Sequence, residues 1–277
     1  MHLTRLSFLC FPVFTAAGLT AQEACPRGTL PAYAHNDYVN KRPLYDALSL
    51  GYKGVEADVF LVDGELRLGH DRREARRGAT LEARYLAPLR SLVARCGALT
   101  TDGRPFLFNV ELKEESRPAF DTLVALLARY AELFTPDSQQ ATAPGYRPPA
   151  IQVVLVGWSP RSVADRTPVP LGTQARLRRP DARAVDAMDP AVGLISVDYR
   201  KTMGRWWLTR GRRRRWLSTV QEIKAAFPAT RIRAYDAPVN ERVYRNLLTA
   251  GVDLIGTMKL APTARLLNSI VGPVKGP

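Results

Sequence analysis

Three carboxylates occupy positions in or at the end of apolar, strand-like segments. Glu56 and Asp58 lie two residues apart in one such segment, and Glu111 ends another. Because side chains alternate along a strand, a spacing of two directs Glu56 and Asp58 to the same side. Carboxylates that share a site repel one another unless a cation lies between them. Oxygen ligands favour a hard ion, so we expect Glu56, Asp58 and Glu111 to bind one divalent cation, Mg²⁺ or Ca²⁺.

Two histidines are predicted at the same end of the fold as these carboxylates. The chain contains three histidines, and His2 lies in an N-terminal segment that resembles a signal peptide. A lone histidine is more often structural, but His35 and His70 both accompany the acidic residues. Imidazole titrates near neutral pH, which suits it to take up or donate a proton. We therefore expect His35 and His70 to be catalytic as an acid–base pair, and the sequence leaves open which is the acid.

The segments that carry these residues alternate between strands and helices. We predict strands at residues 30–34, 54–62, 65–68, 105–112, 151–156, 193–197, 231–234 and 252–256. We predict helices at residues 43–50, 81–95, 118–134, 216–227, 241–250 and 262–271. No element is assigned to residues 169–183. The pair Asp63-Gly64 is typical of a hairpin turn.

This order predicts an α/β fold, a TIM-type (β/α)8 barrel with a small β-hairpin insertion after strand 2. An open doubly wound sheet is the alternative, but the chain lacks the glycine fingerprint of that fold. In a barrel, chemistry takes place where the strands end, which is where the histidines and carboxylates are predicted. A chain of 277 residues is long enough for one such barrel.

The N-terminus has the layout of a signal peptide, with Arg5, an apolar stretch and the small pair Thr20-Ala21. We expect residues 1–21 to be removed on export to the periplasm or the exterior, and residues 22–277 to form a single barrel domain. Cys25 and Cys96 then remain in an oxidising compartment. Cys25 precedes the first strand and Cys96 lies just past the end of the helix that returns from the site, so we expect a disulfide at the opposite end of the barrel. Two free thiols are the alternative.

The chain is strongly basic, with a formal net charge of +14. This charge favours phosphate-bearing substrates or contact with an anionic membrane surface. The densest basic run, residues 210–215, is flanked by Trp206, Trp207 and Trp216, a mixture that occurs at lipid or nucleic-acid surfaces. A solvated helix start is the alternative explanation of that run. We expect no specific nucleic-acid partner, and the oligomeric state is not readable from the sequence.

Four motifs together carry a resemblance to a known superfamily. They are Ala34-His35-Asn36-Asp37, Val55-Glu56-Ala57-Asp58-Val59, Asp63-Gly64 followed by Gly69-His70-Asp71, and Asn109-Val110-Glu111-Leu112-Lys113. This ordered set resembles the phospholipase-C-like phosphodiesterases, which include glycerophosphodiester phosphodiesterases and phosphatidylinositol-specific phospholipases C. The closest resemblance is to the branch named after altered inheritance of mitochondria protein six.

The resemblance implies a phosphoric diester hydrolase that depends on a divalent metal. It implies a glycerophosphodiester or phospholipid-type substrate, with Asn36 and Lys113 as substrate-binding residues. The chain departs from the glycerophosphodiesterase pattern at several positions. His35-Asn36-Asp37 and Arg42-Pro43-Leu44 replace His-Arg-Gly and Pro-Glu-Asn-Thr, Tyr235 replaces a tryptophan, and Met258 replaces an acidic residue. The head group of the substrate therefore stays open.

Two other functions also remain open. One is a lyase-type relative that cyclises a lipid phosphodiester with the same residues. The other is a non-catalytic barrel that binds anionic lipid.

Overall fold

The structure of this chain is a computed structural model that describes residues 25–134, 149–157, 170–176, 192–203, 210–228 and 230–272. The expected signal peptide, residues 1–21, lies outside the described residues, as do Trp206 and Trp207. Within the described ranges, no helix combines the length and the apolar character that a bilayer crossing requires.

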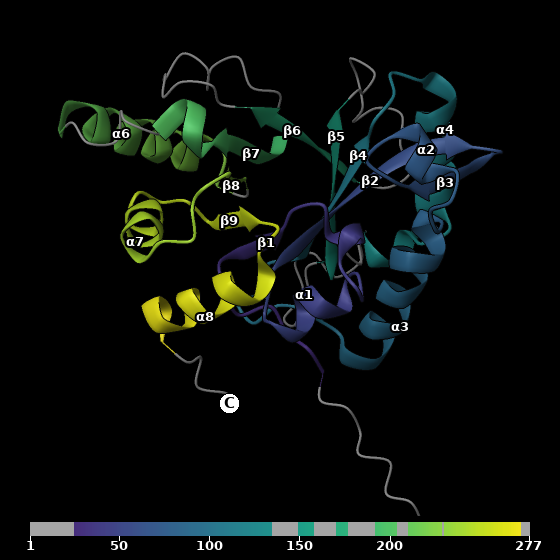
Figure 1. The fold of residues 1–277 in the computed structure, drawn as a ribbon, viewed down its shortest axis with the longest axis horizontal. Coiled ribbons are helices and arrows are strands. Elements are labelled where there is room, and N and C mark those ends of the chain that lie inside the picture. Colours follow the sequence, from purple (N-terminus) through teal and green to yellow (C-terminus); the bar gives the residue numbers. More distant parts are fainter. Residues whose placement is uncertain are drawn as a thin grey trace, which may run out of the picture.

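One sheet contains every described strand, and it closes on itself (Figure 1). The strands are β1 (Ala32–Ala34), β2 (Gly54–Val62), β3 (Glu65–Leu68), β4 (Phe106–Leu112), β5 (Ile151–Gly157), β6 (Leu171–Arg176), β7 (Val192–Asp198), β8 (Arg231–Tyr235) and β9 (Leu254–Thr257). Their order is β1-β9-β8-β7-β6-β5-β4-β2-β3, and a further β1–β2 pairing closes the barrel. Only β3 pairs antiparallel, with β2. The predicted TIM-type barrel with a hairpin after its second strand is confirmed.

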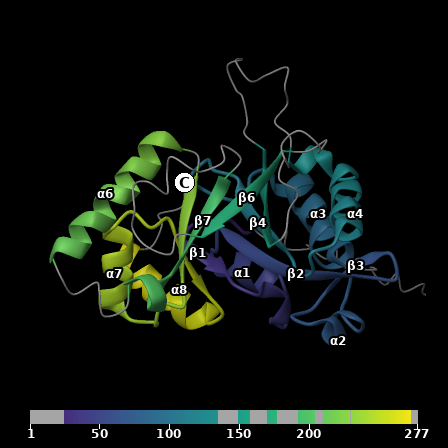
Figure 2. The ribbon, with the colours of Figure 1, turned by 90° about the horizontal axis from the view of Figure 1, so that it is seen from above.

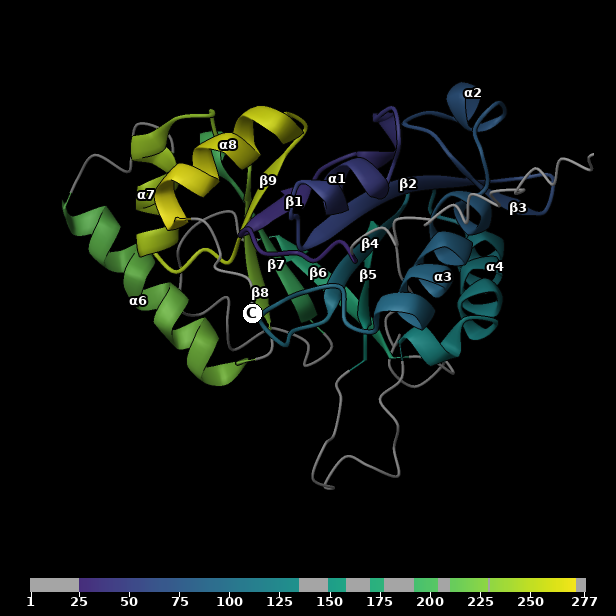
Figure 3. The ribbon, with the colours of Figure 1, turned by 90° about the horizontal axis from the view of Figure 1, so that it is seen from below.

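Helices surround the barrel, with α3 and α4 on one side and α6, α7 and α8 on the other (Figures 2 and 3). They are α1 (Tyr45–Ser49), α2 (Arg72–Ala75), α3 (Ala87–Cys96), α4 (Arg117–Ala128), α6 (Arg210–Ala226), α7 (Glu241–Thr249) and α8 (Leu260–Val271). Shorter helical turns are η1 (Asp37–Val39), η2 (Glu82–Leu86), η3 (Ala131–Leu133) and η5 (Tyr199–Met203). Ser116 and Asn240 cap the N-termini of α4 and α7, because their side chains accept hydrogen bonds from backbone N–H groups three residues on.

The predicted helix over residues 81–95 is divided into the π-helical turn η2 and the α-helix α3. Pro88 lies in the first turn of α3. Proline lacks a backbone N–H, so it is tolerated at the start of an α-helix but not inside one. The proline therefore places the change of helix type at this point.

The core has an outer part between the strands and the helices and an inner part inside the barrel. The inner cluster consists of Tyr33, Leu107, Val154, Leu194 and Leu254. Gly54 faces the same space, and a Cβ atom there would lie 2.8 Å from the Cβ of Leu107. These apolar side chains form a layer inside the barrel, and the predicted polar site lies beyond it at the end where the strands terminate.

The β2–β3 hairpin carries His70 back toward the barrel. Asp63 and Gly64 form its turn with φ angles of 51° and 81°, which suits a tight turn that needs positive φ at both positions. Val62 pairs with Glu65 and Val59 with Leu68. The backbone N–H of Gly69 then donates to the carbonyl of Asp58 at 3.2 Å. The hairpin therefore places His70 beside Asp58.

The predicted disulfide between Cys25 and Cys96 is confirmed, with Cα atoms 5.6 Å apart. Cys25 precedes β1 and Cys96 ends α3, so the bond lies at the end of the barrel where the strands begin. A parallel bridge between Gly28 and Thr100 continues the same contact.

The basic run of residues 210–215 lies inside a helix that begins earlier than predicted. Helix α6 begins at Arg210 rather than at residue 216, so the arginines form its first turns. Trp216 is only 1% exposed and packs in the outer core. The indole of Trp216 therefore cannot contact a lipid or nucleic-acid surface, whereas the described side chains of Arg214 and Arg215 are exposed, as a solvated helix start predicts.

Candidate active site

Strands β2 and β4 bring the three predicted carboxylates together inside the mouth of the barrel. Asp58 pairs with Glu111 in the register of the two strands, and alternation places Glu56 on the same inner side. One carboxylate oxygen from each of Glu56, Asp58 and Glu111 lies within 4.8 Å of the others. Glu56 is 1% exposed and Asp58 is fully buried. The cluster is therefore a set of oxygen ligands held at the spacing that a cation needs.

Glu56 has a different set of partners on each of its oxygens. Its Oε2 accepts hydrogen bonds from the hydroxyl of Tyr33 at 2.9 Å and from Nη1 of Arg233 at 2.5 Å. Its Oε1 lies 3.9 Å from Nε2 of His35. Burial alone would raise the pKa of this carboxyl, but the Arg233 guanidinium and His35 hold the pKa below its usual value. Glu56 is therefore ionised, with one oxygen bound and the other turned toward His35.

Asp58 receives all its contacts on one oxygen. The Oδ2 atom accepts from the hydroxyl of Tyr38 at 3.0 Å and lies 3.1 Å from Nδ1 of His70 and 3.4 Å from Nζ of Lys113. The Oδ1 atom is buried and has no hydrogen-bond partner among the described residues. A buried carboxylate oxygen without a partner carries a desolvation cost that a bound cation would remove. The buried Oδ1 atom without a described partner is the strongest indication that these carboxylates suit a metal ion.

The ionised form of Glu111 is also destabilised by its surroundings. Burial raises the pKa of its carboxyl, and the charge of Asp58 raises it further, although Lys113 opposes both effects. Nζ of Lys113 lies 3.4 Å from Oε1 of Glu111. A divalent cation among these groups would stabilise the ionised form of Glu111. The residues present therefore fit a hard divalent ion, with oxygen donors only.

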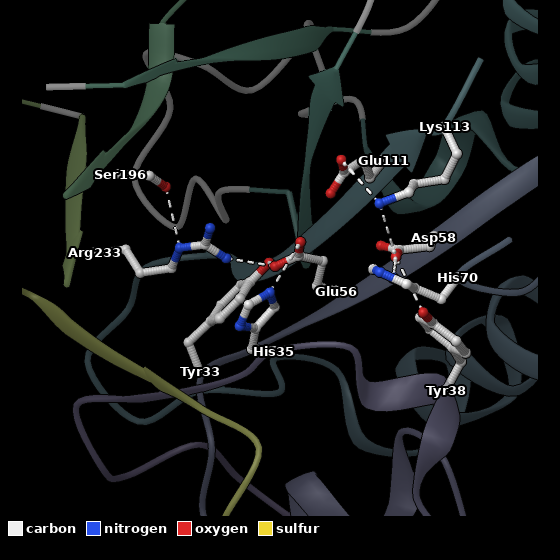
Figure 4. A network of polar contacts seen from close by, with 10 residues as sticks. All are labelled: Tyr33, His35, Tyr38, Glu56, Asp58, His70, Glu111, Lys113, Ser196 and Arg233. Carbon is white, nitrogen blue, oxygen red and sulfur yellow. Dashed lines mark hydrogen bonds and ion pairs between the residues drawn. The ribbon is translucent and has the colours of Figure 1, made fainter. Parts of the chain in front are cut away.

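The two histidines lie beside different carboxylates, His35 next to Glu56 and His70 next to Asp58 (Figure 4). The side chain of His35 is 26% exposed and that of His70 is 63% exposed. Burial lowers the pKa of His35, and the charge of Glu56 partly offsets this effect. The backbone N–H of His70 donates to the carboxylate of Glu74 at 2.9 Å, which fixes the loop that carries the ring.

The two predicted substrate-binding residues have different positions. Lys113 bridges Asp58 and Glu111, so in this structure its charge is directed at the carboxylates. Asn36 follows His35 with φ 50° and ψ 48° in the left-handed region, which asparagine tolerates better than most residues. Its side chain makes no hydrogen bond to another described residue, and contact with a substrate stays a prediction for both residues.

Four further residues complete the site and were not predicted from the sequence. Tyr33 and Tyr38 donate to Glu56 and Asp58, while Arg233 binds Glu56 and donates through Nε to the hydroxyl of Ser196 at 3.0 Å. The guanidinium of Arg233 lies 4.6 Å from the centre of the Tyr33 ring. A signal for Arg233 existed, because an arginine two residues from Arg231 within an otherwise buried strand marks an inward-facing charge.

The buried side chain of Asp37 holds the β1–α1 connection in place through hydrogen bonds. Its buried carboxylate accepts hydrogen bonds from the N–H of Leu44 at 2.6 Å, the hydroxyl of Tyr85 at 2.9 Å and the amide of Asn40 at 3.0 Å. Burial raises its pKa to about 6 despite these hydrogen bonds. Asp37 thus fixes the segment that carries Tyr38 over Asp58.

Comparison with known proteins finds a family that matches part of this chain. Residues 27–130 match the family described as the AIM6-like phosphodiesterase domain. An altered inheritance of mitochondria protein 6 homolog from Arthroderma benhamiae is 35% identical over 72 residues, which is 24% of this chain and 23% of that protein. The chain thus matches about a quarter of this relative's length.

Two solved structures share the fold at low sequence identity. A phosphodiesterase from Oleispira antarctica, in complex with the product sn-glycerol-3-phosphate, superposes with a TM-score of 0.50 and 14% identity, covering 88% of this chain and 98% of that one. A mutant tryptophan synthase alpha-subunit from Pyrococcus furiosus has the same TM-score at 12% identity, covering 90% and 99%. Because enzymes of different chemistry superpose equally well, these likenesses show the barrel alone.

The partial family match coincides with the predicted site motifs. The motifs with His35, the Glu56–Asp58 pair, His70 and Glu111 all fall within residues 27–130. The predicted resemblance to the phospholipase-C-like phosphodiesterases, with its AIM6-like branch, is confirmed.

Proposed function

We propose that this chain, whose residues 27–130 carry an AIM6-like phosphodiesterase domain, hydrolyses a phosphodiester with the help of a divalent cation. His35 and His70 would act as its acid–base pair, and Glu56, Asp58 and Glu111 would hold the ion. The substrate class is a glycerophosphodiester or a phospholipid-type phosphodiester, as the resemblance implies.

A single observation carries this proposal. Two histidines border a buried three-carboxylate cluster, one at 3.9 Å from Glu56 and the other at 3.1 Å from Asp58. Asp58 also keeps a buried oxygen without a described partner. Groups that exchange protons thus border a site suited to positive charge, which is the combination that phosphoryl transfer requires.

The residues of the site have two kinds of role, stabilising negative charge and positioning other side chains. A bound divalent ion supplies positive charge for the phosphoryl oxygens. Lys113 adds a second positive charge at the same edge of the carboxylate cluster, 3.4 Å from both Asp58 and Glu111. Arg233 and Tyr33 fix Glu56, so that its second oxygen keeps a constant position toward His35. Tyr38 fixes Asp58 in the same way.

Hydrolysis would then proceed by two proton transfers. One histidine takes a proton from water as the water oxygen bonds to phosphorus. The phosphorus–oxygen bond to the leaving alcohol breaks, and the other histidine donates a proton to the departing alkoxide. The products are a phosphomonoester and an alcohol, and the two histidines exchange their protonation states through solvent before the next turnover.

The proposal includes export of the mature chain, residues 22–277, after removal of the signal peptide. The disulfide between Cys25 and Cys96 supports this location, because disulfides persist in oxidising compartments. A small-molecule or lipid phosphodiester would reach the enzyme there.

The decisive test is product analysis on a panel of phosphodiesters. The protein is incubated with glycerophosphodiesters, diacyl phospholipids and a dinitrophenyl-type diester, in Mg²⁺, in Ca²⁺ and with a chelator. We expect a phosphomonoester product by phosphorus NMR, loss of turnover on chelation and recovery when the ion returns. Asp58→Asn should lower kcat at least about a hundredfold, and Asp121→Asn, a surface control on α4 that pairs with Arg117, should leave it unchanged.

The other outcomes separate the alternatives. A cyclic phosphate product would identify the lyase-type reaction, and full activity in the chelator would remove the metal from the mechanism. Lipid binding without turnover of any diester would identify the non-catalytic barrel.

A further inference from the structure

Exposed apolar side chains gather at the end of the barrel that carries the site. Among the described residues, the exposed large hydrophobic side chains are Val39 (56%), Tyr45 (44%), Met258 (54%) and Val271 (46%). Val39 and Tyr45 follow β1 and Met258 follows β9, so three of them lie where the strands end. Val271 ends α8 at the other end of the barrel. This uneven distribution indicates that the residues at the mouth of the barrel form a binding surface.

Two hollows join these residues into one surface beside the site. The first, about 530 Å³ in volume, is lined by Asn40, Met258 and Lys259 among others. The second, about 630 Å³, is lined by Val39 together with Tyr38, and by residues of the α2 segment. Val39 and Asn40 are consecutive and therefore connect the two hollows. Because Tyr38 donates to Asp58, the second hollow borders the proposed active site.

Four cations flank the apolar residues. Lys41 and Lys259 lie beside Val39 and Met258, and Arg73 and Arg77 line the second hollow. All four are exposed, and none forms an ion pair with another described residue.

The acidic residues nearest to these cations already have partners within the chain. Asp71 accepts from the N–H of Glu74, Glu74 accepts from the N–H of His70, and Asp46 pairs with Arg42. Asp71 and Glu74 line the second hollow together with Arg73 and Arg77. None of the four cations takes part in an ion pair among the described residues, so each can bind an external anion.

We propose that this surface, named here the mouth rim and consisting of Val39, Lys41, Arg73, Arg77, Met258 and Lys259, docks on an anionic lipid bilayer. Aliphatic side chains enter the acyl boundary, and cations bind the charged headgroups around them. A single-stranded nucleic acid would instead require successive aromatic side chains on which bases stack, whereas Tyr45 is the one aromatic among the exposed large hydrophobic side chains described at this end. The surface is distinct from the basic run of α6, whose Trp216 is buried.

Docking in this orientation deepens the proposed function and, as far as turnover is concerned, rests on it. The bilayer would face the mouth of the barrel, where Tyr38 lines the second hollow and His70 lies in the chain between two other lining residues, Gly69 and Asp71. A lipid phosphodiester would then reach the acid–base pair from the headgroup layer. Binding itself requires no turnover, so it is measured separately from the reaction.

The test is co-sedimentation of the purified protein with vesicles in the presence of a chelator. Vesicles of phosphatidylcholine alone are compared with mixed phosphatidylcholine–phosphatidylglycerol vesicles. We expect binding to the mixed vesicles that weakens as salt is added. Arg73→Gln combined with Arg77→Gln should weaken it by roughly tenfold or more, and Val39→Ser combined with Met258→Ser by at least about fivefold.

Matched variants at the opposite end of the barrel provide the controls. Val271→Ser removes an apolar side chain of similar exposure, and Arg27→Gln with Arg95→Gln removes two exposed cations near the disulfide. Both should leave binding unchanged, and circular dichroism checks that every variant is folded.

The proposal is overturned by any of three results. These are no preference for anionic vesicles, equal losses in the rim and control variants, or binding to single-stranded DNA in place of vesicles. Vesicle binding by a protein that hydrolyses no phosphodiester would keep the mouth rim and reject the proposed activity.

Discussion

At the scale of residues, the site depends on how each buried charge is paired. Glu56 is satisfied by Arg233 and Tyr33, whereas Asp58 keeps one buried oxygen without a described partner. Glu56 thus contributes a charge that is already paired. A bound cation would stabilise the ionised form of Asp58 more than that of Glu56. The difference between the two carboxylates follows from Arg233, which lies near Glu56 and contacts neither Asp58 nor Glu111 in the described set of ion pairs.

The first prediction at this scale concerns the histidines. His35→Ala and His70→Ala should each lower kcat by at least about a hundredfold, which is typical for loss of a general acid or base. His70→Gln keeps a side chain able to reach Asp58 but cannot exchange protons at neutral pH, so it should be as impaired as His70→Ala. Steady-state kinetics on a diester that the product analysis shows to be hydrolysed gives the measurement. Near wild-type turnover in both alanine variants would exclude this acid–base pair.

The second concerns the buried ion pair between Arg233 and Glu56, whose side chains are 4% and 2% exposed. Arg233→Met leaves the Glu56 charge unpaired and should lower the free energy of unfolding by about 3–5 kcal/mol. The double variant with Glu56→Gln should be less destabilised than the sum of the two single variants, with a coupling of about 2 kcal/mol. Urea unfolding of the four proteins measures this cycle, and additive losses would show that the pair is not coupled.

At the scale of elements, short connections position the reactive side chains. The β2–β3 hairpin returns His70 to Asp58 through a turn with positive φ at Asp63 and Gly64. The β1–α1 connection carries Tyr38 over Asp58, and Asp37 fixes this connection through hydrogen bonds from Leu44 and Tyr85. In each connection, hydrogen bonds to a buried carboxylate determine where the functional residue lies: Asp58 for His70, and Asp37 for the segment that carries Tyr38.

A prediction for the β1–α1 connection follows from the pKa of Asp37, which burial raises to about 6. A raised carboxyl pKa means that the folded state binds the proton more tightly than the unfolded state. The stabilisation is complete below about pH 4 and is lost as pH rises through about 6, an effect of about 3 kcal/mol. The difference in unfolding free energy between wild type and Asp37→Asn should therefore fall by about that amount from pH 4 to pH 7.

Urea unfolding at several pH values tests this expectation. The comparison with Asp37→Asn matters because other carboxyls, including that of Glu56, have lowered pKa values and change stability in the opposite direction. A difference between the two proteins that does not vary with pH would show that Asp37 is ionised throughout.

At the scale of the whole molecule, the two ends of the barrel have separate roles. The end where the strands terminate carries the carboxylates, the histidines and the mouth rim. The end where the strands begin carries the disulfide and the bridge between Gly28 and Thr100. Changes at the disulfide should therefore alter stability without altering the geometry of the site.

The corresponding prediction is that Cys25→Ser with Cys96→Ser lowers the free energy of unfolding while kcat stays at its wild-type value. The bond joins residues 71 apart, and the chain-entropy estimate for such a loop is about 4 kcal/mol. Urea unfolding of the oxidised wild type and the double variant measures the difference. A large loss of kcat in a folded double variant would contradict the separation of the two ends.

The sequence by itself determined the local patterns and their order. The spacing of Glu56 and Asp58 fixed their common side, because alternation along a strand is a local property. The alternation of strands and helices predicted the barrel, and the direction of α3 in that barrel predicted the Cys25–Cys96 bond, both confirmed. The roles of His35 and His70 remain a prediction that the proposed kinetics will test.

Only the tertiary structure decided which distant residues meet. Arg233 and Glu56 are 177 positions apart, and their pairing depends on closure of the barrel, which no local pattern encodes. Likewise Trp216 is buried because α6 packs its face on the strands, although its basic neighbours indicate solvent. Strand β6 was missed because Leu171–Arg176 contains few apolar residues and is specified mainly by its neighbours β5 and β7. Long-range contacts of this kind arise from packing, so residue spacing alone cannot predict them.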